Sequence, residues 1–88
     1  MVRRKLIVHG RVQGVGFRFA VARAAAQRGV AGWARNRPDG AVEVVLEGEE
    51  EAVAAVAEFC RRGPRGASVT DVEATAEAPT GLSGFETR

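Results

Sequence analysis

Residues 10–18 have the sequence GRVQGVGFR, and in this stretch a strand pattern gives way to a helix pattern. Over residues 5–12 the side chains alternate with a period of two, which is typical of a half-buried strand. From Phe17 onward, apolar residues recur at helical spacing until Gly29 provides a helix stop. The chain is therefore predicted to open with a strand, a glycine-rich bend and a helix.

The rest of the chain adds three long strands, one helix and a short terminal strand. In the last long strand the apolar residues change phase, which predicts a bulge near Thr70-Asp71. The predicted elements are strands at 30–36, 42–47 and 67–77, a helix at 49–62 and an edge strand at 85–88. This order is that of an α+β, ferredoxin-like (split βαβ) sandwich, in which two helices cover one face of an antiparallel sheet.

Length and composition describe one ordinary domain. The chain has 88 residues, of which 45% are hydrophobic and 27% charged, and this usage excludes disordered and fibrous classes. No apolar stretch approaches the ~18 residues of a membrane span, and the run Leu6-Ile7-Val8 is too short for a signal peptide. We therefore expect a single domain over residues 1–88, located in the cytoplasm.

Positive and negative charges are divided between the two halves of the chain. Residues 1–38 contain nine bases and no acid, whereas residues 39–88 contain eleven acids and four bases, so the halves carry +9 and −7. A basic half suggests an anionic partner, whether a nucleic acid, a membrane surface or a small phosphorylated or carboxylated molecule. Codon bias towards arginine, or ordinary solvated surface charge without a partner, would explain the same counts. We expect the acids to lie on solvated strand faces and at helix ends.

One cysteine and one histidine limit the available chemistry. They exclude an internal disulfide and fall short of a tetrahedral metal site, so neither a metal nor another cofactor is predicted. Cys60 lies in an alanine- and valine-rich helical stretch, and we interpret it as a small buried hydrophobic residue. Any enzyme built on this chain must work without a covalent nucleophile, on a substrate that is itself labile.

The bend between the first strand and the first helix is the strongest candidate for a binding site. Unpaired amides and the helix dipole favour an anion there, and Gly14 and Gly16 let the backbone approach it closely. Arg18 opposes the dipole of its own helix, a cost that a bound anion would offset. An ordinary turn followed by an exposed arginine is the alternative interpretation.

A neutral amide is suited to hold an attacking water, because it accepts one hydrogen bond and donates another. The chain has only three such side chains, Gln13, Gln27 and Asn36. Asn36 ends the second predicted strand, just before the turn Arg37-Pro38-Asp39-Gly40. A water-holding role and an ordinary role in forming that turn both fit this position.

Residues 10–18, together with Gly32-Trp33-Ala34-Arg35-Asn36 and Asp39-Gly40-x-Val42-Glu43, closely resemble the signature segments of the acylphosphatase family. The resemblance implies metal- and cofactor-free hydrolysis of small acyl phosphates to carboxylate and inorganic phosphate. It also implies that Arg18 binds the substrate phosphate and that Asn36 orients the attacking water. The phosphate-binding loop would be formed by the amides of Arg11, Val12, Gln13, Gly14, Val15 and Gly16.

Two non-catalytic alternatives share the same fold class. The domain would then be a phosphate-binding module, or an RNA-binding module in which the basic half tracks a phosphate backbone. The strand regions offer Trp33 and few other aromatics for base stacking, which disfavours RNA. We expect a monomer whose partner is a small acyl phosphate, not a nucleic acid or a membrane. The eight bases other than Arg18 would supply a positive field that attracts this substrate.

Overall fold

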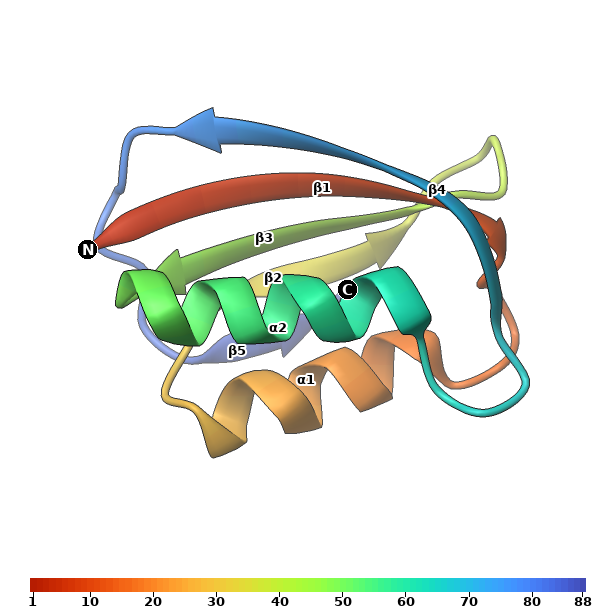
Figure 1. The fold of residues 1–88 in the computed structure, drawn as a ribbon, viewed down its shortest axis with the longest axis horizontal. Coiled ribbons are helices and arrows are strands. Elements are labelled where there is room, and N and C mark those ends of the chain that lie inside the picture. Colours follow the sequence, from red (N-terminus) through yellow and green to blue (C-terminus); the bar gives the residue numbers. More distant parts are fainter.

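The computed structural model describes all 88 residues and contains seven elements in the predicted order (Figure 1). Each element lies within a few residues of its predicted position, and the first strand extends back to the N-terminus. The elements are β1 (Val2–Arg11), α1 (Phe17–Gln27), β2 (Ala31–Asn36), β3 (Val42–Gly48), α2 (Glu50–Arg62), β4 (Ser68–Glu77) and β5 (Phe85–Thr87). No helix is both long and apolar enough to span a membrane.

The five strands form one sheet in the order β4-β1-β3-β2-β5, with both helices on the same face (Figure 1). The four long strands are antiparallel to their neighbours, as the sequence predicts. The edge strand β5 instead runs parallel to β2. Because β1 and β2 are each antiparallel to β3, and β5 is parallel to β2, the carboxyl ends of β1, β2 and β5 lie along the same side of the sheet. This side, and not the outer strand β5, is the edge at which α1 begins.

The predicted bulge lies in β4. His9 pairs with Asp71, whereas the next residue of β1, Gly10, pairs with Val69, so Thr70 is left without a partner. This extra residue shifts the alternation of side chains by one position. It explains why Val69 and Val72 are both directed to the helix-covered face although their spacing is odd.

The core lies between the helices and the sheet and consists of fourteen buried residues. Phe17, Val21 and Ala25 form the buried stripe of α1. The corresponding stripe of α2 ends at Cys60, which is fully buried. Burial raises the pKa of the Cys60 thiol to about 12, so the side chain is a neutral hydrophobic group, as predicted.

The helix-free face of the sheet differs from the solvated surface that the sequence suggests. On β3, Val45 is fully buried, and the neighbouring carboxylates Glu43 and Glu47 are only 8% and 1% exposed. The expectation that these acids are solvated is therefore wrong. The reason is that long basic side chains of the neighbouring strands lie over β3 and pair with them, since Arg3 contacts Glu47 and Arg35 contacts Glu43.

Glu47 is the centre of the hydrogen-bond network on this face. Its carboxylate accepts bonds from Arg3 Nη1 at 2.8 Å and from the amide and hydroxyl of Thr80 at 2.9 and 3.1 Å. The amides of Gly81 and Leu82 each donate to it at 3.0 Å. These donors, the Thr80 amide foremost, lower the pKa of Glu47 to about 2. The carboxylate thereby anchors the loop that leads from β4 into β5.

Ion pairs across the sheet neutralise part of the basic N-terminal half. Besides Arg3 and Arg35, Lys5 lies 4.0 Å from Glu43, and Arg37 lies 3.0 Å from Asp39. The predicted positive field is therefore smaller than the residue counts suggest, because these four bases pair with acids of the C-terminal half. The pairs bring the two oppositely charged halves of the chain together.

Candidate active site

The candidate site lies at the edge of the sheet where β1 and β2 end and α1 begins (Figure 1). The loop of residues 12–16 connects β1 to α1 and passes along this edge. Asn36 is the last residue of β2, and Arg18 lies in the first turn of α1. The topology therefore brings the loop, Arg18 and Asn36 to the same end of the molecule.

Two glycines determine the conformation of the loop. Gly14 and Gly16 have φ angles of +74° and +76°, in the left-handed region that other residues adopt only at a cost. A Cβ atom at either position would meet nothing within 4 Å, so the backbone angle and not a lack of space requires glycine. Gly16 is also the N-cap of α1, which therefore begins without a side-chain cap.

The amides of this loop are available to an external acceptor. The hydrogen bonds made outside the helices and strands include none donated by the amides of residues 12–16. The first turn of α1 contains no acidic residue, so no carboxylate of this helix compensates its dipole. Free amides at a helix N-terminus form an environment that favours an anion.

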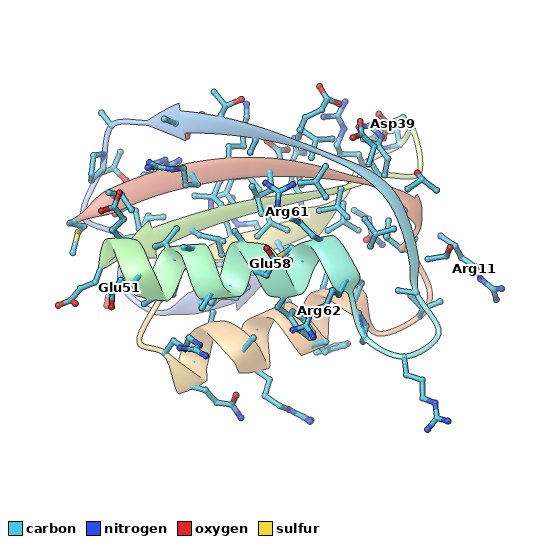
Figure 2. The ribbon with its side chains drawn as sticks, in the orientation of Figure 1. Arg11, Asp39, Glu51, Glu58, Arg61 and Arg62 are labelled. Carbon is cyan, nitrogen blue, oxygen red and sulfur yellow. The ribbon has the colours of Figure 1, made fainter.

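The connecting loop begins one residue after the start of the predicted substrate-binding range 11–16. Arg11 is the last residue of β1 and pairs with Ser68 of β4, and its side chain extends outward, away from the body of the protein (Figure 2). The side chain of Val12 is buried in the core. Gln13, Gly14, Val15 and Gly16 therefore form the bend proper, in which the two glycines are exposed, with Val12 as its anchor.

Gln13 fixes the loop to the hairpin between β2 and β3. Its Nε2 donates to the main-chain oxygens of Arg37 and Ala41, at 2.8 and 2.9 Å. The side chain thus connects the candidate anion site with the turn that follows Asn36. This role is not evident from the sequence, because the two acceptors are main-chain atoms of a distant segment.

The turn after Asn36 is stabilised by Asp39. The Ala41 amide donates to Asp39 Oδ1 at 3.0 Å, and this bond lowers the pKa of the Asp39 carboxyl. Asp39 therefore makes the turn-forming contact that Asn36 was also suited to make. Asn36 keeps its main-chain pairing with Val42, while its side-chain amide is exposed and makes no hydrogen bond within the protein. The Pro38-Asp39-Gly40 sequence is typical of a turn and predicts that the chain reverses direction here.

Arg18 is half-buried and forms no ion pair with any carboxylate side chain. Its Nη1 donates to the main-chain oxygen of Arg88, just beyond β5. One of the five N–H donors of the guanidinium is used in this way, and the others point to no acceptor in the protein. Sequence reasoning missed this contact, since nothing local to Arg18 indicates that residue 88 lies beside it.

No cluster of three or more His, Cys, Asp or Glu side chains is arranged to hold a metal ion. The groups assembled at the edge are instead main-chain amides, one guanidinium and one neutral side-chain amide. Such a set can hold an oxyanion and orient a water molecule. The fold and this site define a class of small α+β sandwich suited to holding an oxyanion between a glycine-rich loop and an arginine.

Comparison with known proteins assigns the chain within this class. The family model described as Acylphosphatase matches residues 4–87. A relative from Thermococcus kodakarensis, named acylphosphatase, is 52% identical over 85 residues, which cover 97% of this chain and 93% of its own. The chain belongs to the acylphosphatase family. It is accordingly a hydrolase that acts on acyl phosphates and releases phosphate.

Solved structures agree with this assignment. The crystal structure of acylphosphatase from Bacillus subtilis superposes with a TM-score of 0.96 at 40% identity, covering 100% of this chain and 99% of that one. The same fold also occurs inside a longer protein. The structure of HypF from T. kodakarensis matches 100% of this chain but 12% of its own, with a TM-score of 0.85 and 32% identity.

Proposed function

We propose that the loop amides and Arg18 hold the phosphoryl group of a small acyl phosphate while Asn36 orients the water that attacks it. Three features at one sheet edge support this assignment: the unpaired amides of residues 12–16, the guanidinium without a carboxylate side-chain partner, and the exposed amide side chain. The first of these carries the proposal, because amides that donate to no protein group are suited to a phosphate oxygen.

The phosphoryl group would lie against the N-terminus of α1. There the loop amides and the helix dipole face its oxygens, and Arg18 contributes the guanidinium N–H groups not used on Arg88. Donors already held in place by the fold stabilise the charge that develops on these oxygens in the transition state. Gln13 keeps the loop in this geometry through its two bonds to the hairpin.

The reaction then needs little further chemistry. The water held by Asn36 attacks phosphorus as the bond from phosphorus to the acyl oxygen breaks, and the carboxylate leaves with the bonding electron pair. A phosphate oxygen accepts the proton of the water, which gives inorganic phosphate. A carboxylate is a weak base and leaves without protonation, so neither a metal nor a cofactor is required by this scheme.

The edge is open on the side where the acyl group would extend. None of the clefts in the structure is lined by Arg18, Asn36 or the loop residues. An acyl group would therefore meet few walls, which favours recognition through the phosphate. We accordingly propose small acyl phosphates with varied acyl groups as substrates.

Nucleic acid is not proposed as a partner. RNA readers of this fold class present aromatic residues on the open face of the sheet. Here Trp33 is covered by the guanidinium of Arg88, 4.6 Å from the ring centroid, and Arg35 lies 5.9 Å away. On the same face, Arg35 is paired with Glu43 and Arg3 with Glu47. This face therefore lacks both the stacking platform and the free positive charge that RNA binding needs.

We further propose that the protein acts as a monomer in the cytoplasm. The fourteen core residues are buried between the sheet and its own two helices, so the fold is complete without a second copy. Its one cysteine is a buried free thiol, which fits a reducing compartment.

The test is hydrolysis of acetyl phosphate by the pure protein in excess chelator. We expect Arg18→Ala and Asn36→Ala each to lower kcat/KM by roughly 10²–10³-fold, the scale for removing one preorganised donor. Arg23→Ala is the matched control, because Arg23 is an exposed arginine of the same helix without a contact at the edge. Full activity in Arg18→Ala or Asn36→Ala would overturn the assigned roles, and so would an equal loss in the control.

A further inference from the structure

One charged side chain lies on the helix-covered face of the long strands. Arg4 alternates with Arg3 and Lys5 and so shares a face with the core residues Leu6 and Val8. Its partners in register are Leu46 and Ala76, both uncharged. A half-buried guanidinium on this face departs from the apolar pattern of its neighbours and therefore needs an explanation.

Arg4 lines a cleft of about 200 Å³ between α2 and the strands β1 and β4. The cleft exists because the side chains that face each other across it are small. The alanines of α2 leave the outer strand β4 only partly covered. Its volume is below the 300–1,000 Å³ range of drug-sized pockets, so it suits a smaller molecule. Six apolar residues form its walls: Val2, Leu6, Val53, Ala54, Ala57 and Ala74.

A second arginine completes the polar lining of this cleft. Arg61 lies in the last turn of α2, and Figure 2 shows its side chain reaching from the helix towards β1. Neither Arg4 nor Arg61 has a carboxylate within 4.0 Å; the one bond of Arg4 goes to the main-chain oxygen of Arg3 at 3.0 Å. Glu50 contributes a single negative charge to the lining. The net charge of the lining is therefore positive.

We propose that this cleft binds a small apolar monocarboxylate, separately from the active site. The apolar walls would cover the hydrocarbon body, and the guanidinium groups of Arg4 and Arg61 would hold the carboxylate. One negative charge matches the net positive charge of the lining. Inorganic phosphate is a poorer match, because it has no hydrocarbon body to cover the apolar walls, and the oxygens not held by the two arginines would lose their hydration against those walls. The acid released by the hydrolase reaction belongs to the proposed ligand class.

The test uses sodium benzoate and sodium hexanoate as probes in an NMR titration of the full chain, first without inorganic phosphate and then with inorganic phosphate added in excess. We expect the amide signals of Ala54, Ala57 and Ala74 to shift, with saturation in roughly the millimolar range for so small a ligand. Benzamide, which has the same ring but no charge, should bind more weakly. Loss of the benzoate shifts on addition of phosphate would place the acid in the active site and overturn the proposal.

Three variants locate the binding site. Arg4→Gln and Arg61→Gln should each weaken benzoate binding about tenfold or more, the loss expected for one charge-assisted hydrogen bond. Arg62→Gln is the matched control, since it removes the next arginine of α2, which does not line the cleft. Ala54→Leu fills the cleft from an exposed helix position and should abolish binding while the fold is retained.

Acetyl phosphate hydrolysis separates this proposal from the active-site assignment, because Arg18→Ala should lower kcat/KM by roughly 10²–10³-fold but leave benzoate binding intact. Two results would overturn the second site. The first is an absence of shifts at the cleft even at tens-of-millimolar benzoate. The second is wild-type affinity in Arg4→Gln or in Ala54→Leu.

Discussion

The helix-free face of the sheet and the edge where α1 begins both use arginine, but with opposite outcomes. On the face, Arg3 and Arg35 donate to buried carboxylates at 2.8 and 2.6 Å. At the edge, Arg18 pairs with no carboxylate side chain, and the amides of residues 12–16 donate no main-chain hydrogen bond. The same residue type therefore stabilises one region and is left available to an anion in the other. An arginine with a structural role is therefore distinguished from one with a functional role by its partner, and not by the number of basic residues nearby.

This difference predicts that stability and activity respond to separate sets of residues. Changes on the face remove interactions that hold the sheet and the loop before β5 together, so they lower stability. Changes at the edge alter groups that are open to an anion, so they lower activity even where, as at Gly16, they also cost some stability. A face variant that lowered the activity of the folded protein, or an edge variant that left activity unchanged, would contradict this separation.

Glu47→Gln is expected to have the largest effect on stability. The amide keeps the size of the side chain but loses its charge and presents N–H groups to donors such as Gly81 and Leu82. We expect the melting temperature to fall by about 10 °C or more, with kcat/KM of the folded protein unchanged. Calorimetry alongside acetyl phosphate hydrolysis at low temperature measures both quantities.

Glu58→Gln is the control for this change, because Glu58 is an exposed carboxylate of α2 without an ion pair. Its melting temperature should match that of the wild type. Equal melting temperatures for the two variants would mean that Glu47 is not the anchor of this face.

Acid should remove the contribution of Glu47. The pKa of its carboxyl is about 2 in the folded protein, against 4.5 for the free group. Because the folded pKa is the lower one, the stabilisation is complete above pH 4.5 and is lost as the pH falls towards 2. The difference in melting temperature between wild type and Glu47→Gln should therefore shrink over this interval. A difference that stayed constant from neutral pH to pH 2 would contradict the assignment.

Gly16→Ala tests the edge with a smaller expected effect. Holding alanine at a φ of +76° costs about 1–2 kcal/mol, and relief of that strain would rotate the amides of the loop. We expect a comparable loss of stability in Gly29→Ala, at the other end of α1, where φ is +67°. Only Gly16→Ala should also lower kcat/KM. A loss of activity in both variants would show that the effect arises from general destabilisation.

Ionic strength should have the smallest effect. Arg3, Lys5, Arg35 and Arg37 pair with acids of the protein, so the field at the edge comes from the few remaining bases. We expect kcat/KM to change by roughly twofold between low and physiological salt. A steep dependence would indicate that the paired bases also attract substrate, which would weaken the distinction between face and edge.

The order of the elements could be predicted because its signals are local. Side-chain alternation, helix stops and the phase change near Thr70 each depend on a few neighbouring residues, and the structure confirms all three. The burial of Glu43 and Glu47 could not be predicted in this way. It depends on bases that reach them from β1 and β2, and alternation along β3 alone suggests a solvated face.

The same distinction applies to the candidate site. Arg18 is conspicuous in the sequence because it opposes the dipole of its own helix, and Asn36 because few amide side chains are present. The contacts that set their surroundings connect distant segments. Gln13 bonds to a residue 24 positions away, and Arg18 to one 70 positions away. Such contacts become visible only once the strands are arranged in the sheet.

The contrast between the two regions requires that an anion bind at the edge and not on the face. A crystal structure of the protein with inorganic phosphate tests this claim most directly. We predict phosphate bound to the amides of the 13–16 bend and to the guanidinium of Arg18. Phosphate bound among the ion pairs of Arg3 and Arg35, with none at the bend, would contradict it.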